Sequence, residues 1–95
     1  MNKTELILSI AEATGLSRKD IELGFNAAIE QITQALTAGE KVQIVGFGCF
    51  ETKLRAARTG RNPRSGQEVP IPSAVVPAFK PGKALKEAVE QGAQR

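Results

Sequence analysis

The chain has 95 residues, enough for one domain, and its 13 basic and 10 acidic residues give a net charge of +3. It has no His, Tyr or Trp and one Cys, which excludes an intrachain disulfide and a thiolate zinc site. An enzyme, a cofactor, a metal site and a small-molecule substrate are therefore not expected. The sequence contains neither an apolar signal segment nor a run of about 18 apolar residues that could span a membrane, so a cytosolic protein is expected.

Two helices are predicted within residues 1–39. Asn2 opens a capping-box pattern, and Gly15 is a natural helix stop. Ser17 repeats the cap before a longer helix that ends near Gly39. That helix carries a wide apolar stripe at three- and four-residue spacing, made of Ile21, Phe25, Ala28, Ile29, Ile32, Ala35 and Leu36. Because its polar face is net acidic, the pair is interpreted as a helical hairpin and not as a DNA-reading helix-turn-helix.

Three strands and a final helix are predicted after the hairpin. Val42–Val45 and Cys49–Arg55 are rich in β-branched and aromatic residues, with a tight turn between them. Val75–Phe79 brings the chain back to the sheet. A helix is expected over Lys83–Glu90, followed by a short tail over residues 91–95.

The segment from about residue 54 to 74 has a different character and is predicted to project as a β-ribbon. Pro70 and Pro72 lack N–H donors, so the return strand must lie at an edge. Ala56 and Ala57 are too small to fill a core. The ribbon is also the centre of the positive charge, because residues 53–86 hold eight basic side chains and one acidic one. Such segregation favours a polyanionic partner over an unpartnered basic surface.

The tip of this ribbon is the run Arg58-Thr59-Gly60-Arg61-Asn62-Pro63-Arg64. Two paired strands lie about 4.8 Å apart, close to the width of about 6 Å of a DNA minor groove. Pro63 is interpreted either as a wedge that unstacks a base step or as an ordinary turn residue. Asn62 is a candidate for contact with an A·T edge, but the minor groove is degenerate, so weak sequence preference is expected.

A body of about 75 residues outside the ribbon buries little apolar surface by itself. An intertwined homodimer would bury the remaining apolar faces, while a monomer of three helices over three strands is the alternative. The residues predicted to form the dimer core are Phe25, Ile29, Ile32, Leu36, Phe47, Phe50 and Phe79.

Three stretches resemble the bacterial histone-like HU proteins and the related integration host factor subunits: Gly46-Phe47-Gly48-Cys49-Phe50, Arg55-Ala56-Ala57-Arg58-Thr59-Gly60-Arg61-Asn62-Pro63 and Val76-Pro77-Ala78-Phe79-Lys80-Pro81-Gly82-Lys83-Ala84-Leu85-Lys86. The resemblance covers residues 1–90. It implies an α+β fold: an intertwined dimer with a helical hairpin over 1–39, and a three-stranded antiparallel sheet and short C-terminal helix over 40–90. A long β-ribbon arm protrudes from the sheet.

The same resemblance implies a function in double-stranded DNA binding, with the arms in the minor groove and Pro63 intercalated. Such proteins bend DNA and compact the bacterial nucleoid. The contacts it implies fall on Lys3, Lys53, Arg55, Arg58, Arg61, Arg64, Lys80, Lys83 and Lys86. The run from Val76 to Phe79 resembles HU more than integration host factor, which favours weak sequence specificity and a homodimer, although a heterodimer with a paralogue is an alternative. A site-selective bending subunit and a structural RNA-binding protein are the competing functions.

Overall fold

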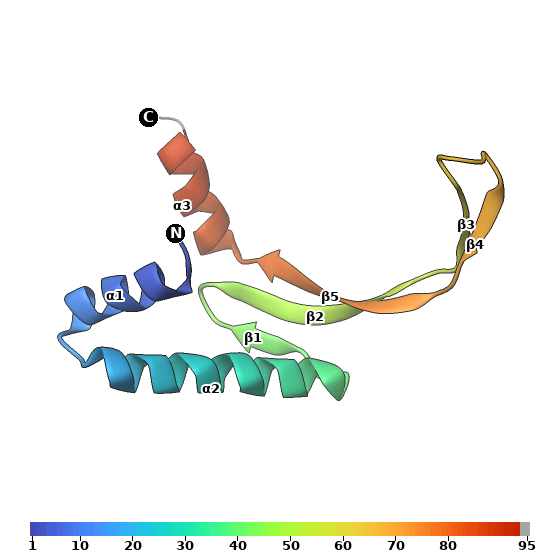
Figure 1. Ribbon diagram of the computed structural model, residues 1–95. Helices are drawn as coiled ribbons and strands as arrows, with labels where there is room; N and C mark the ends of the chain where they lie inside the picture. Colours follow the sequence, from blue (N-terminus) through green and yellow to red (C-terminus); the bar gives the residue numbers. More distant parts are fainter. Residues whose placement is uncertain (94–95) are drawn as a thin grey trace. The chain divides into compact units, whose positions relative to one another are not determined.

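The structure, a computed structural model, describes residues 1–93 and divides into two compact units, Met1–Gln34 and Ala35–Arg95. Within residues 1–93, three α-helices and five β-strands follow one another (Figure 1). The helical hairpin, the antiparallel three-stranded sheet, the ribbon and the final helix predicted from the sequence are all present.

The first unit contains α1 (Lys3–Thr14) and most of α2 (Arg18–Thr37). Both predicted caps form: the backbone N–H of Glu5 donates to Asn2 Oδ1 at 2.9 Å, and that of Asp20 donates to Ser17 Oγ at 3.1 Å. Gly15 ends α1 in the left-handed conformation, with φ of 75°. Local capping chemistry therefore accounts for where the two helices begin and where α1 ends.

The sheet of the second unit has the strand order β1-β2-β5 and is antiparallel throughout. Its strands are β1 (Val42–Ile44), β2 (Gly48–Arg55) and β5 (Ala74–Pro81). The prediction that Val45 belongs to the first strand was wrong, because the chain already turns there: Phe47 N–H donates to Ile44 O at 2.9 Å. Gly46 supplies the positive φ of 84° that this turn needs.

The arm is a separate two-stranded ribbon of β3 (Arg58–Arg61) and β4 (Glu68–Ile71). It continues from the far ends of β2 and β5, which pair as far as Arg55 and Ala74 (Figure 1). On each side of the ribbon, two residues without strand geometry separate it from the sheet. Because β3 and β4 pair with each other, Pro70 on β4 and Pro72 just after it interrupt no inner strand of a sheet.

The last element, α3 (Lys83–Ala93), is longer than predicted. Residues 91–93 belong to the helix and not to a tail; no proline or capping glycine stops it near Glu90, and Gly92 is accommodated within it. The rest of the predicted tail, residues 94–95, lies outside the described residues.

Candidate nucleic-acid interface

The tip of the arm is a turn closed by its own backbone. Asn62 N–H donates to Gln67 O, and Gly66 N–H donates to Asn62 O, both at 2.8 Å. Asn62 Oδ1 also accepts the N–H of Arg64 at 2.9 Å, which brackets Pro63 between them. The closed turn therefore presents Pro63 at the apex of the arm, and Asn62 has a structural role there whether or not it contacts DNA.

Cationic side chains lie on both faces of the arm. The register pairs Arg58 with Ile71 and Arg61 with Glu68. Since side chains alternate along a strand, Arg58 and Arg61 point to opposite faces of the ribbon. The predicted arm cations Lys53, Arg55 and Arg64 are also exposed. A thin ribbon with positive charge on both faces can reach the phosphates on both sides of a groove.

One face of the three-stranded sheet carries a charged cluster that the sequence did not reveal. Glu51 is 7% exposed and forms ion pairs with two lysines: Lys80 Nζ lies 3.1 Å and Lys41 Nζ 3.7 Å from its carboxylate oxygens. Lys80 was predicted as a DNA contact and is here ion-paired within the protein. Alternation along β2 puts Glu51 and Lys53 on one face of the sheet, but only the register between strands brings Lys80 to Glu51.

The hydrogen bond from the Lys80 ammonium holds the pKa of Glu51 below its usual range, and the charges of Lys80, Lys41 and Lys53 act in the same direction. Partial burial opposes this shift. A lowered folded-state pKa means that ionised Glu51 stabilises the fold above its unfolded-state pKa. That contribution is lost as the pH falls through the folded-state value.

Acidification is therefore expected to destabilise the wild-type protein more than the Glu51→Gln variant. Urea unfolding at a series of pH values from neutral down into the acidic range would measure this difference. Glu12→Gln, which removes an exposed carboxylate from α1, is the control and should keep the wild-type pH dependence. Equal loss of stability in the wild type and the Glu51→Gln variant would show that the ion cluster does not support the fold.

The predicted flanking contacts lie on two separate units. Lys83 and Lys86 are exposed in the first turn of α3, where Lys83 Nζ lies 3.9 Å from Glu87 Oε1. Lys3 lies at the start of α1 and lines a hollow with Arg18 and Glu22. The structure thus brings Lys80, Lys83 and Lys86 into one unit with the arm, while Lys3 remains a separate prediction.

The residues predicted as the dimer core do not form a core within one chain. Among the described residues, the buried hydrophobic side chains are Ile7 and Ile21. Phe47 is 43% exposed and Phe79 37%, although their ring centroids lie 5.3 Å apart, and Ile29 is 53% exposed. A cluster of aromatic rings this open to water is typical of a surface that a partner covers.

Within residues 1–93 no three His, Cys, Asp or Glu side chains are grouped so that they could hold a metal ion. No helix in that part of the chain is both long and apolar enough to cross a membrane.

Comparison with known proteins decides the family. The family model described as bacterial DNA-binding protein matches residues 1–90. The chain belongs to this family, which includes HU. Over 90 residues it is 59% identical to the DNA-binding protein HU of Geobacillus stearothermophilus, and this alignment covers 95% of this chain and 100% of that protein. It is 55% identical to DNA-binding protein HU 1 of Bacillus subtilis (strain 168) over 89 residues, 94% of this chain and 97% of the relative.

Solved HU structures have the same fold. The chain superimposes on HU from an Anabaena HU–DNA cocrystal with a TM-score of 0.89 at 44% identity, covering 94% of this chain and 97% of the other. HU from Thermotoga maritima gives a TM-score of 0.68 at 46% identity, with coverage of 94% and 98%. The arm and sheet of this HU family member are therefore arranged as the resemblance implied, while the roles of individual residues stay predictions.

Proposed function

We propose that this protein is an architectural DNA-binding protein of the HU type, which binds duplex DNA with little sequence specificity and bends it. The single observation that carries the proposal is the arm: a two-stranded ribbon with cations on both faces and Pro63 at a closed apex. A ribbon of about 5 Å between strands enters a minor groove of about 6 Å with modest widening. Pro63 then unstacks a base step, and the bend exposes further phosphates to the flanks.

The functional unit in this proposal is an intertwined homodimer, with two arms on one duplex. The dimer is supported by the exposed phenylalanines and by the small buried core of the single chain. DNA compaction in the bacterial nucleoid, and hence a cytoplasmic location, is the cellular role that fits such a dimer. A heterodimer with a paralogue would bury the same apolar surfaces.

The proposal is tested by energy transfer between dyes at the two ends of a short duplex, with and without the protein. Protein binding is expected to raise the transfer efficiency, because bending brings the ends together. Binding without a change in transfer would remove bending from the proposal, and no binding at low salt would remove DNA as the partner.

Arg58→Ala is expected to lower affinity by a similar factor on every DNA sequence. It should also flatten the dependence of log K on log salt by about one phosphate contact per arm, since each neutralised phosphate contributes a slope of about −0.9. Fluorescence anisotropy at several salt concentrations measures this slope. Lys19→Ala, an exposed cation on α2, is the control. A wild-type slope in the Arg58→Ala variant would exclude Arg58 from the interface.

Two related functions predict different binding profiles. A site-selective subunit of the integration host factor type would prefer one deformable site over random DNA by more than about 10³, whereas HU-type binding would not. A structural RNA-binding protein would prefer double-stranded RNA to nicked or bent DNA at one salt concentration. The absence of Tyr and Trp argues against base-stacking RNA platforms.

A further inference from the structure

The two strands of the arm pair without interruption, from Arg58 opposite Ile71 to Arg61 opposite Glu68. Pro70 pairs with Thr59 in the register, and Pro72 follows directly after β4. Because Asn62 N–H donates to Gln67 O, the alternation along the ladder puts both prolines at non-hydrogen-bonded positions, where a missing N–H removes no bond. The ribbon is separated from the sheet by two residues on each side.

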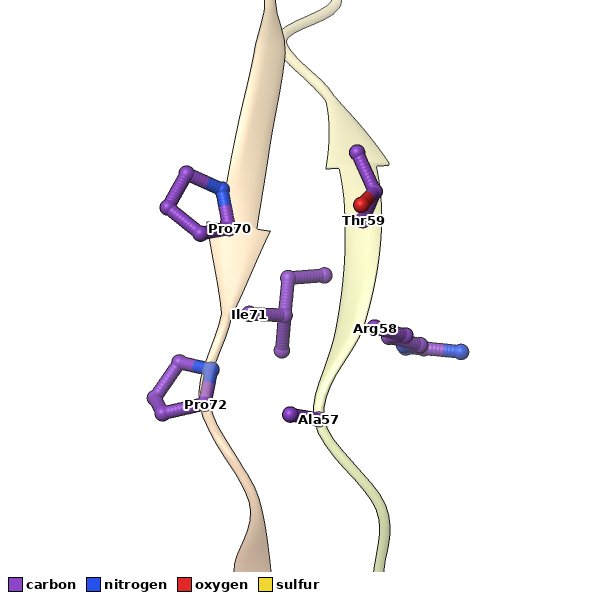
Figure 2. Close-up of a pocket in the computed structure, with 6 residues that line it drawn as sticks. All are labelled: Ala57, Arg58, Thr59, Pro70, Ile71 and Pro72. Carbon is purple, nitrogen blue, oxygen red and sulfur yellow. The ribbon is translucent and has the colours of Figure 1, made fainter.

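A side-chain contact across the ribbon adds to the pairing of its two strands. Figure 2 shows Ile71 pointing toward β3, while the rings of Pro70 and Pro72 lie away from it. A Cβ placed on Gly60 would come within 2.6 Å of Ile71 Cδ1 and 3.3 Å of Ile71 Cγ1. Ile71 therefore lies against the bare backbone of Gly60, on the strand opposite its own.

Gly60 is required for space and not for backbone conformation. Its φ is not in the positive range that Gly46 and Gly66 adopt. Gly60 and Ile71 are also half-buried, although every other described residue from Lys53 to Val75 is exposed. The pair is thus the least exposed part of the described arm.

We propose that Ile71 seated on Gly60 forms a clasp that holds the two strands of the arm in register and so positions Pro63. The inference rests on the proposed DNA-bending function. Both residues are positioning residues, because they act through the proline and not by contact with DNA. A wedge must meet a base step in the correct orientation, and a misplacement of about 1 Å can remove most of the effect of a positioned group.

The test is Gly60→Ala, measured by end-to-end energy transfer and by salt-dependent anisotropy on the same duplex. The added Cβ displaces the flexible end of Ile71, so the change in energy transfer on binding is expected to fall to about half or less. The slope of log K against log salt should stay within one phosphate contact of the wild type, because the arm cations remain. The thermal melting of the dimer should also stay unchanged, since the arm lies outside the sheet.

A second, compensating substitution distinguishes the loss of the clasp from a general disturbance of the arm. Ile71→Val removes Cδ1, the atom nearest to the new Cβ, so the double variant Gly60→Ala/Ile71→Val is expected to bend DNA more than Gly60→Ala alone. Ile71→Ala alone should reduce bending, because it removes the clasp from the other side. Gly92→Ala on α3, where an added Cβ meets open space, is the control and should bend DNA as the wild type does.

Each outcome decides between the proposals. Reduced bending with recovery in the double variant supports the clasp. The clasp would be overturned if Gly60→Ala bent DNA as the wild type does, or if the double variant did not recover bending. It would also be overturned if the slope of log K against log salt decreased together with the bend. A wild-type protein that does not bend DNA would instead overturn the proposed function.

Discussion

Replacing Pro63 by Ala is expected to remove most of the DNA bend while lowering affinity by less than about tenfold. The closed tip, held by Asn62 and Gly66, would remain, so the ribbon would still enter the groove with its cations. What is lost is a rigid apolar ring able to occupy a base step, which offsets an unstacking cost of a few kcal/mol per step. Affinity rests mainly on phosphate contacts, which this substitution leaves in place.

End-to-end energy transfer at saturating protein measures the bend, and anisotropy measures the affinity. Pro72→Ala is the matched control, because it removes a proline ring from the arm at a distance from the tip. An unchanged bend in the Pro63→Ala variant would refute the wedge and return Pro63 to the status of a turn residue.

Replacing Phe79 by Ala is expected to destabilise the folded protein by about 3 kcal/mol or more per protomer, within the range for a Phe lost from a core. Phe79 lies between the rings of Phe50 and Phe47, with centroids 4.8 and 5.3 Å away. A phenylalanine that remained 37% exposed would lose much less on truncation. The large expected effect therefore depends on a second copy of the chain covering this face.

Thermal unfolding at several protein concentrations tests both parts of this prediction. The midpoint of the wild type should rise with concentration, as it does when folding and association are coupled. Val75→Ala on the same strand, where the side chain is 69% exposed, is the control and should have a small effect. A wild-type midpoint independent of concentration, together with a small effect of Phe79→Ala, would favour the monomer.

Much of the fold was predictable because its signals are local. Asn2, Ser17 and Gly15 act on neighbouring backbone groups, so the ends of the helices follow from a few adjacent residues. Pro70 and Pro72 likewise required an edge whatever the rest of the chain did. The errors were also local: the turn begins at Val45, one residue earlier than predicted, and α3 runs on to Ala93.

The sequence by itself determined which segment is the arm, where its charge lies and that its tip carries Pro63, because composition and turn chemistry need no partner strand. The tertiary structure alone decided which residues meet across strands. The register brings Lys80 and Lys41 to Glu51, and it places Ile71 over Gly60. A shift of one residue would have moved each side chain to the other face, so no inspection of single strands could have found these contacts.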